Sequence, residues 1–260
     1  MSIITLTTDL GYRDHYTASL KGTLYSLYGG ATVVDFSHGI SPYNIMEAAF
    51  ILKSSFHKFP PGSIHLIAVD AEGTARTETI VMFHRGHYFV GPDNGVMSLI
   101  KGEEEVECIL VDTQQLPPLG IARAFLAQKR LAPIAVQLAL QTPLSELGED
   151  HLMRESLWGE PSYVGGSLRG IVLHIDHFGN AITNILRSTF METKGDRSFQ
   201  IFIRNLRLQR IVTGYGDVSK GDSLAIFSDN DHLEIAIREG SAAQLLGLKV
   251  QDMLTIEFYG

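Results

Sequence analysis

The first seventy residues alternate strand-like and helix-like segments, and this alternation constrains the fold more than any other feature of the sequence. Short runs of β-forming residues occupy positions 3–8, 32–36 and 63–69. Between them, apolar residues recur at helical spacing, namely Tyr16, Leu20, Leu24 and Leu27, then Ile45, Ala48, Ala49, Leu52 and Phe56. A strand–helix–strand–helix–strand order is typical of βαβ units. We therefore expect a Rossmann-like α/β domain with a mostly parallel sheet over residues 1–160.

The second half of the chain has a different pattern. Short strand candidates follow one another there, at 168–175, 199–203, 209–212, 223–227, 233–237 and 253–258. Clusters of Gly, Asp and Asn separate them, and the only helical pattern lies around 242–246. These features predict a smaller antiparallel β-barrel domain over residues 166–260, with the boundary between Trp158 and Gly166.

Charge and cysteine content exclude several functional classes. The 260 residues include 21 Lys and Arg against 29 Asp and Glu, a net charge of −8, which disfavours a nucleic-acid or anionic-membrane surface. The single cysteine, Cys108, excludes an intrachain disulfide and a multi-cysteine zinc site, and its apolar surroundings predict a buried side chain. The N-terminal residues lack the basic region of a signal peptide, and no apolar run has membrane-spanning length. We expect a cytoplasmic protein without membrane contact.

Polar residues follow three successive predicted strands. They form the clusters T-T-D-L-G-Y-R-D with Asp9 and Asp14, D-F-S-H-G-I-S-P-Y with Asp35, His38 and Tyr43, and V-D-A-E-G-T-A-R with Asp70, Glu72 and Arg76. A single carboxylate after a strand is often only the cap of the next helix. Ligands of open α/β sheets, however, bind outside the carboxyl ends of the strands. Three clusters in succession therefore predict a shared ligand site.

Other site chemistries find less support. The chain has no P-loop, no dinucleotide fingerprint and no G-x-S-x-G nucleophile elbow. The segment H-I-D-H at 174–177, together with Asp9 and Asp14, offers a competing metal set, but His177 would point away from His174 and Asp176 on a strand. We therefore assign no metal ligands. Tyr12, Tyr43 and Phe178 offer rings for a base or a sulfonium cation.

Seven motifs, in order along nearly the whole chain, resemble those of the S-adenosylmethionine hydroxide adenosyltransferase family, which is related to fluorinating and chlorinating enzymes. They are I-T-L-T-T-D-L-G-Y-R-D-H-Y at 4–16, L-K-G at 20–22, V-V-D-F-S-H-G-I-S-P-Y-N-I at 33–45, F-P-P-G-S-I-H-L-I-A-V-D at 59–70, G-P-D-N-G at 91–95, I-D-H-F-G-N-A-I-T-N-I at 175–185 and L-E-I-A-I-R-E-G-S-A-A at 233–243.

This resemblance implies a fold, an assembly and a reaction. The fold is an N-terminal α/β domain followed by a C-terminal β-barrel, in agreement with the change of pattern near residue 166. The assembly is a homotrimer, with each site between the N-terminal domain of one subunit and the C-terminal domain of the next. The reaction displaces methionine from C5′ of S-adenosylmethionine by water, hydroxide or, in the specialised branch, a halide. No cofactor is implied beyond the substrate.

The resemblance also implies roles for individual residues. Asp9 matches the carboxylate that holds the ribose hydroxyls, and Tyr43 an aromatic residue that packs on the sugar. Asp14 and Asp176 match acidic positions that face the methionine ammonium. The adenine side is matched by Phe178, Asn180 and the segment from Ile237 to Glu239.

Asp70 distinguishes the two branches of the family. The hydroxide-using branch has an aspartate there, within a water-activating Asp, Arg and His set. A carboxylate orients water and accepts its proton, whereas it would repel a halide. The resemblance therefore implies that Asp70 positions the water, with Arg76 favouring hydroxide through its fixed positive charge.

The sequence departs from the family pattern at two places. The family's D-P-G-V-G-T-x-R is one residue shorter here, D-A-E-G-T-A-R, and Leu126 stands where the family has its catalytic histidine. Lys129, Arg130 or His38 are the candidates for replacing that histidine. We expect hydrolysis of S-adenosylmethionine to adenosine and L-methionine. The alternatives are a non-catalytic S-adenosylmethionine- or adenosine-binding protein, an enzyme acting on another 5′-substituted adenosine, and a metal-dependent hydrolase.

Overall fold

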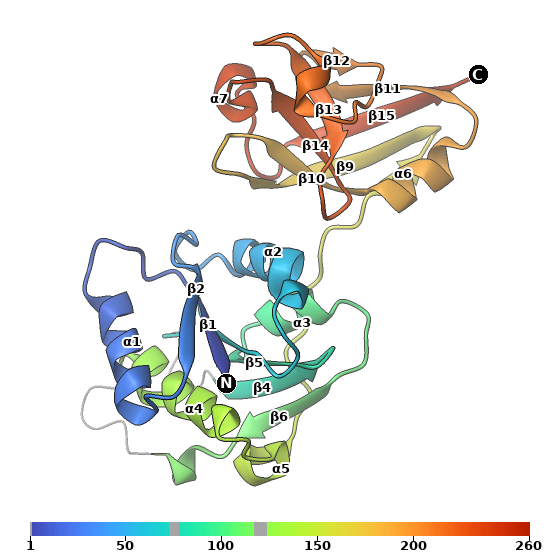
Figure 1. Ribbon diagram of the computed structural model, residues 1–260. Coiled ribbons are helices and arrows are strands. Elements are labelled where there is room, and N and C mark those ends of the chain that lie inside the picture. The colour runs from blue at the N-terminus through green and yellow to red at the C-terminus, as the bar shows by residue number, and fades with distance from the viewer. Residues whose placement is uncertain (1, 73–77, 117–123) are drawn as a thin grey trace. The chain divides into compact units, whose positions relative to one another are not determined.

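The structure, a computed structural model, describes residues 2–72, 78–116 and 124–260, which divide into two compact units (Figure 1). The first unit spans Met1–Leu157 and the second Trp158–Gly260. None of the helices in the described ranges combines the length and apolar character that crossing a membrane requires.

The first unit is built on a seven-stranded mixed sheet. Its strands are β1 (Ile3–Thr8), β2 (Thr32–Ser37), β3 (Ile64–Ala68), β4 (Thr79–His84), β5 (His87–Pro92), β6 (Glu107–Val111) and β7 (Gly148–Asp150), in the order β2-β1-β3-β5-β4-β6-β7. The pairings from β2 to β5 are parallel. Those from β5 through β4 and β6 to β7 are antiparallel.

The predicted α/β class is therefore confirmed, but the sheet is mixed rather than mostly parallel. The reason is the tight turn at Arg85 and Gly86, both at positive φ, which joins β4 to β5 as a hairpin. The sequence did not predict β4, because T-I-V-M-F-H is an unbroken apolar run without an alternating pattern.

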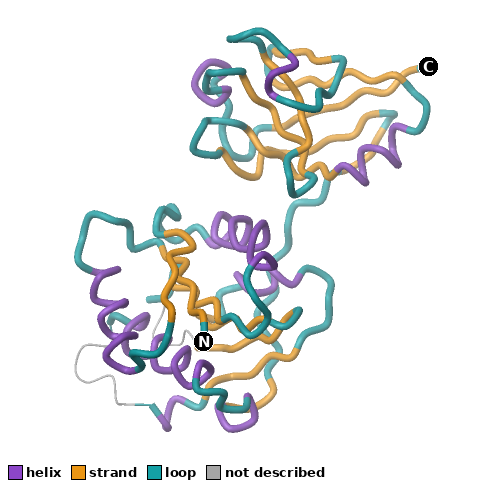
Figure 2. Tube along the Cα trace, in the orientation of Figure 1, coloured by secondary structure: helices purple, strands orange, loops and turns teal. Residues whose placement is uncertain are grey.

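Helices lie on both sides of this sheet (Figures 1 and 2). They are α1 (Tyr16–Leu27), α2 (Ile45–Ser55), α3 (Val96–Lys101), α4 (Ala132–Ala139) and α5 (Leu144–Leu147), with 3₁₀ turns η1 (Phe56–Lys58) and η2 (Thr113–Gln115) and a π-helical segment η3 (Ala127–Leu131) before α4. Leu20 and Leu24 of α1 share a buried core with Ile4 and Leu6 of β1 and Ile134 of α4. The predicted helix is thus confirmed, with Leu20 and Leu24 on its buried face, whereas Leu27 at its end is exposed.

The opposite face of the sheet carries an unusual set of buried aromatic and imidazole rings. His65 of β3 stacks on Phe89 of β5, with 4.8 Å between ring centroids, and both lie against Phe56 of η1. His65 is fully buried; its Nδ1 lies 2.8 Å from the hydroxyl of Thr5 and its Nε2 lies 3.2 Å from Nδ1 of His87. Burial, with the neighbouring His87, lowers the pKa of His65 to about 3.

The second unit is an antiparallel sheet that closes almost into a barrel. Its strands are β8 (Ser162–Val164), β9 (Ser167–Ile175), β10 (Ala181–Leu186), β11 (Ser198–Ile203), β12 (Leu206–Leu208), β13 (Ser223–Phe227), β14 (His232–Ile237) and β15 (Met253–Tyr259), in the order β12-β11-β15-β9-β10-β14-β13 with β8 beside β9. Just after β12, the backbone N–H of Val212 donates to the carbonyl of Ala225 in β13, which links the two edges.

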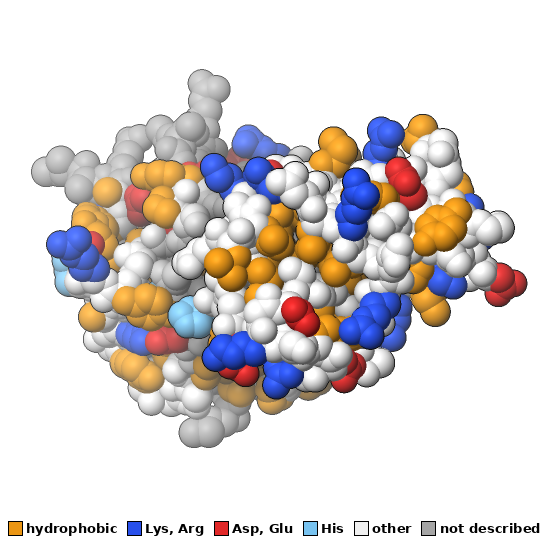
Figure 3. All heavy atoms as spheres, turned by 90° about the horizontal axis from the view of Figure 1, so that it is seen from above, with side chains coloured by type: hydrophobic (Ala, Val, Ile, Leu, Met, Phe, Trp, Pro, Cys, Tyr) orange, Lys and Arg blue, Asp and Glu red, His pale blue; other side chains and the backbone are white. Residues whose placement is uncertain are grey.

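Three shorter elements complete this unit, namely α6 (Arg187–Lys194), η4 (Tyr215–Asp217) and α7 (Ala242–Leu246). The predicted strands near 168–175, 199–203, 223–227, 233–237 and 253–258 are confirmed, as is the helix at 242–246. The predicted strand at 209–212 is wrong, because only Val212 makes a bridge there and β12 lies earlier. On the face seen in Figure 3, basic, acidic and hydrophobic side chains are interspersed.

Candidate functional site

The carboxylate of Asp9 joins the loops that follow three neighbouring parallel strands. Its Oδ2 accepts hydrogen bonds from the backbone N–H of Tyr43, at 2.9 Å, and from that of Asp70, at 3.1 Å. Asp9 follows β1, Tyr43 lies after β2, and Asp70 lies after β3, so the carboxyl ends of these strands meet at one residue. The structure therefore brings together three residues that the sequence predicted for one site.

Two of these three residues have a strained backbone. Tyr43 has φ +65° and Asp70 has φ +47°, a region that residues other than glycine rarely adopt. In both, the unusual conformation accompanies the N–H bond to Asp9, and such conformations collect at functional sites. Within the described part of the chain, both bonds use Oδ2 of Asp9, so Oδ1 keeps its capacity to accept from a ligand hydroxyl.

A second network lies beside Asp9. Nδ1 of His38 lies 2.8 Å from the hydroxyl of Thr8, and its Nε2 lies 3.1 Å from Oδ1 of Asp35. The Lys21 ammonium lies 2.7 Å from Oδ2 of the same aspartate. Burial raises the pKa of Asp35, but the bonds from Lys21 and His38 outweigh it and hold the pKa below its ordinary value. His38 is thus buried, with Nδ1 at the Thr8 hydroxyl and Nε2 beside the Asp35 carboxylate, which makes it a poor replacement for the family histidine.

The remaining predicted residues of the first unit are placed differently. Asp14 is exposed on the connection between β1 and α1, and no hydrogen bond among the described residues joins it to Asp9. The ring of Tyr43 is also exposed.

The residues at and near the position of the family's histidine lie at η3. Leu126 is half-buried at the start of η3. Arg130 is buried in η3, one residue after the half-buried Lys129. The predicted partner of Asp70, Arg76, lies outside the described residues.

Asp70 is linked indirectly to Leu126 through Glu72. Oε2 of Glu72 accepts from the backbone N–H of Phe125 at 3.0 Å, and Oε1 accepts from that of Leu126 at 2.9 Å. The two segments at which the sequence departs from the family pattern are therefore in direct contact.

In the second unit, Asp176 and Asn180 build a tight turn between β9 and β10. Asn180 donates from its backbone to Oδ1 of Asp176 at 2.8 Å and from its side chain to Oδ2 at 3.0 Å. Gly179 sits at the tip with φ +84°, where a Cβ would meet the side chain of Ser241. The turn leaves the ring of Phe178 three-quarters exposed, available for stacking on a ligand.

The segment from Ile237 to Glu239 lies at the end of β14. It is joined to the Asp176–Asn180 turn through the chain that follows it, because the N–H of Ala243 donates to the carbonyl of Gly179 at 2.8 Å. Ile237 is buried, and Glu239 has φ +55° and pairs with Lys220 at 2.9 Å. The sequence-predicted residues of the second unit thus also form one cluster.

Sequence reasoning missed a buried carboxyl group in this unit. Glu234 of β14 is only 3% exposed and accepts a 2.7 Å hydrogen bond from the hydroxyl of Tyr215. Burial raises the pKa of Glu234, and the charges of Asp176 and Asp229 raise it further, although the bond from Tyr215 opposes both. A lone glutamate inside L-E-I-A-I was the available signal, since an alternating strand normally places such a residue in solvent.

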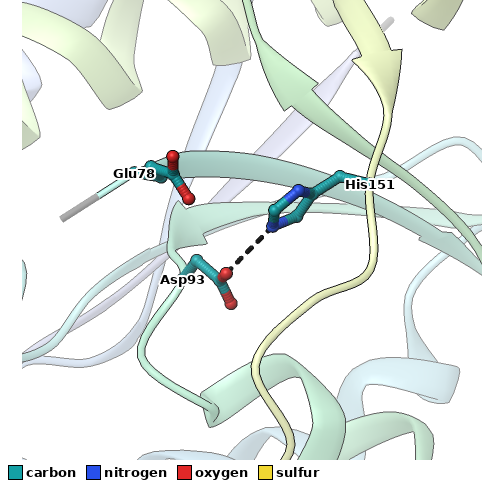
Figure 4. A group of neighbouring side chains, drawn as sticks. All are labelled: Glu78, Asp93 and His151. Atoms are coloured by element: carbon teal, nitrogen blue, oxygen red, sulfur yellow. Dashed lines mark hydrogen bonds and ion pairs between the residues drawn. The ribbon is translucent and has the colours of Figure 1, made fainter. Parts of the chain in front are cut away.

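Potential metal ligands gather at a different place. Among the described residues, the histidines at 174 and 177 belong to no group of three potential ligands. Such a group is formed by Glu78, Asp93 and His151, whose ligand atoms all lie within 4.8 Å of one another (Figure 4). His151 Nε2 lies 3.0 Å from Asp93 Oδ2, and Oδ1 accepts from the N–H of Arg154. Both contacts tie the segment after β7 to the end of β5.

The sole cysteine is not part of any of these clusters. Cys108 of β6 is buried, as predicted, and burial raises the pKa of its thiol to about 12, with the charge of Asp93 adding to the effect. Such a thiol is inert as a nucleophile at neutral pH.

Comparison with known proteins gives matches over nearly the whole chain. The family model described as the SAM hydroxide adenosyltransferase N-terminal domain matches residues 4–148, and the one described as the C-terminal domain matches residues 170–255. The chain is 32% identical to a protein of Thermus thermophilus named (R)-S-adenosyl-L-methionine hydrolase, over 93% of this chain and 94% of that protein. It is 26% identical to a protein of the same name from Methanocaldococcus jannaschii, over 98% and 96%.

Relatives outside the hydrolases, and solved structures, extend these matches. A fluorinase of an Actinoplanes species is 26% identical, over 98% of this chain and 97% of its own length. The crystal structure of an uncharacterized conserved protein from Thermotoga maritima superposes with a TM-score of 0.89 and 28% identity, over 98% of this chain and 99% of that one.

Proposed function

The chain belongs to the SAM hydroxide adenosyltransferase family, as its motifs predicted, and we propose that it hydrolyses S-adenosylmethionine to adenosine and L-methionine. The observation that carries this proposal is the cluster in which Asp9 holds the backbone of both Tyr43 and Asp70. It holds the backbone of Asp70, whose carboxylate is suited to water and unsuited to a halide, beside the residue proposed to hold the ribose. Relatives named hydrolases support the same reaction at the level of the family.

In the proposed step, a water molecule attacks C5′ of the substrate from the side opposite the sulfonium. The new bond joins the water oxygen to C5′, the C5′–S bond breaks, and its electron pair stays on sulfur as the thioether of methionine. Asp70 orients the water and accepts its proton. Arg76 is proposed to favour the developing hydroxide. Because a neutral thioether is a good leaving group, positioning supplies much of the rate, and no cofactor is required.

The binding residues divide between the two units. In the first, Asp9 is proposed to accept from the ribose hydroxyls through Oδ1, Tyr43 to pack on the sugar and Asp14 to face the ammonium. In the second, Asp176 is proposed to face the ammonium as well, while Phe178, Asn180, Ile237 and Glu239 line the adenine. We further propose a homotrimer in which each site joins the first unit of one subunit to the second unit of its neighbour.

One sequence feature favours a second function. Leu126 occupies the position of the family's histidine, and a general acid–base group contributes about 10²- to 10⁴-fold to a rate. A protein that keeps the nucleoside pocket without turnover would bind S-adenosylmethionine or adenosine and release neither product. The cluster around Asp9 serves both functions, so only turnover separates them.

Substitution of Asp70 tests the proposed reaction. Asp70→Asn keeps the backbone bond to Asp9 but removes the proton acceptor, so we expect kcat to fall by about 10²-fold or more while KM changes less than about threefold. Product formation is followed by chromatography of adenosine and methionine, and Asp196→Asn, on an exposed turn of the second unit, is the matched control. Equal turnover by Asp70→Asn and wild type would refute the role of Asp70. Tight binding by calorimetry with no turnover in the wild type would favour the binding protein.

A further inference from the structure

Glu72 makes a two-point contact that no catalytic or binding role accounts for. Its two carboxylate oxygens accept from two successive backbone N–H groups, those of Phe125 and Leu126. Phe125 has φ +65°, whereas Leu126 is right-handed, with φ −61° and ψ −30°. When one of two successive residues has a left-handed and the other a right-handed backbone conformation, their N–H groups point to the same side. Such a pair of N–H groups favours binding of an anion. Glu72 supplies that anion from within the chain.

The contact also lies at the start of a helical stretch. η3 begins at Ala127 and continues directly into α4, so the negative charge of Glu72 faces the N-terminal end of thirteen consecutive helical residues, from Ala127 to Ala139. The partial positive charge at that end stabilises a carboxylate. η3 and α4 are packed in the core of the first unit, which makes them a rigid support.

Glu72 stands two residues after Asp70, and the short segment between them is fixed at three points. The N–H of Asp70 donates to Asp9, Ala71 is buried in the same core as Ala127 and Leu131, and the side chain of Glu72 is held at 125–126. Without the Glu72 carboxylate, this segment would keep the bond of Asp70 to Asp9 and the burial of Ala71, but it would lose its only hydrogen bonds to 125–126 among the described residues. The carboxylate of Asp70 would then be free to move on a backbone that is already strained at φ +47°.

We infer that Glu72 is a positioning residue that fixes Asp70 relative to the start of η3 in place of the family's usual loop. The two departures of this chain, the shortened loop after Asp70 and the leucine at 126, meet at this contact. The family's D-P-G-V-G-T-x-R has no carboxylate in the four positions that follow its aspartate, whereas Glu72 stands two residues after Asp70 here. Because Glu72 acts through Asp70, the inference rests on the proposed hydrolysis.

The test combines a measurement that needs no substrate with one that does. In Glu72→Ala, we expect amide hydrogen exchange at Phe125 and Leu126 to accelerate at least tenfold, and kcat to fall about tenfold with KM within twofold. Glu72→Gln keeps one acceptor oxygen, so it is expected to protect one of the two amides and to restore part of kcat. Glu105→Ala, exposed between α3 and β6, removes the same charge elsewhere and is expected to change neither quantity.

The outcomes distinguish failure of the Glu72 contact, of its positioning role and of the proposed hydrolysis. Unchanged exchange at both amides in Glu72→Ala would show that the carboxylate does not hold this turn, and the inference would be wrong. Faster exchange with an unchanged kcat would show a purely structural contact and would also overturn it. If the wild type binds S-adenosylmethionine but forms no product, the proposed hydrolysis is wrong, and the positioning role is wrong with it. The exchange data still show in that case whether Glu72 holds the amides of Phe125 and Leu126.

Discussion

At the scale of single residues, the candidate site depends on where Asp9 directs its hydrogen bonds. One oxygen of this carboxylate holds two backbone N–H groups at strained positions, and neither of these bonds uses the other oxygen, which we propose accepts from a ligand. Asp9 therefore both shapes the loops and offers an acceptor, which explains why a residue proposed to bind ribose also controls the position of Asp70.

Replacing Asp9 is expected to weaken ligand binding itself. In Asp9→Ala, the hydroxyl acceptor is lost together with the tether of Tyr43 and Asp70. Hydrogen bonds to a charged group contribute about 1.5–3 kcal/mol, so the Kd for S-adenosylmethionine should rise about 10- to 100-fold. Calorimetric titration checks this, with Asp196→Ala as the control. A Kd unchanged from wild type would rule out the ribose assignment.

The sequence predicted which residues gather at this site but not how they are joined. Asp9, Tyr43 and Asp70 follow three predicted strands, and the rule that parallel strands end at one edge places them together. The direction of a loop N–H has no periodic signature, so the bonds from Tyr43 and Asp70 to Asp9 and the contact of Glu72 could not be predicted. Glu234 was missed because the pattern of its strand predicts that one face is exposed to solvent. In the structure Glu234 is buried and accepts a hydrogen bond from the hydroxyl of Tyr215.

At the scale of secondary-structure elements, the predictions succeeded where the pattern was periodic. α1, α2 and the first three strands have clear helical or β-rich signals, and all are present. β4 and β10 were not predicted, because T-I-V-M-F-H and A-I-T-N-I-L lack clean alternation. The hairpin of β4 and β5 is what turns a parallel sheet into a mixed one.

The buried imidazoles between β3, β5 and η1 make the fold sensitive to acid. The pKa of His65 is about 3 in the folded protein and 6.5 when unperturbed, so the unfolded chain binds a proton first as the pH falls. The free energy of unfolding should therefore decrease between pH 6.5 and 3, by about 2 kcal/mol at pH 5 from this residue alone. Burial also lowers the pKa of His84 and His87, which adds to the effect in the same direction.

Urea unfolding at pH 7 and pH 5 checks this expectation. His65→Asn removes the titrating group. Between pH 7 and pH 5, the free energy of unfolding of this variant should therefore decrease by about 2 kcal/mol less than that of the wild type. His15→Asn, at an exposed position before α1, should behave as the wild type does. If His65→Asn and the wild type lost the same stability on acidification, the burial of a neutral His65 would not be the cause.

At the scale of the whole molecule, the charge suits the proposed substrate. The chain has 29 acidic against 21 basic residues, and S-adenosylmethionine carries a sulfonium and an ammonium besides its carboxylate. The proposed binding residues belong to two separately folded units, one an α/β unit and the other a nearly closed barrel. In the proposed site, the first unit supplies the groups that act on C5′ and the ribose, the second supplies the adenine contacts, and each contributes one carboxylate for the ammonium.

Incubation with S-adenosylmethionine in ¹⁸O-water tests direct attack of water at C5′ most directly. Mass spectrometry of the products should show adenosine with one ¹⁸O at its 5′ oxygen and an equal amount of unlabelled methionine. Asp70→Asn should form little of either product in the same time. Adenosine without label, or substrate that stays intact although calorimetry shows it to be bound, would contradict hydrolysis by an Asp70-oriented water.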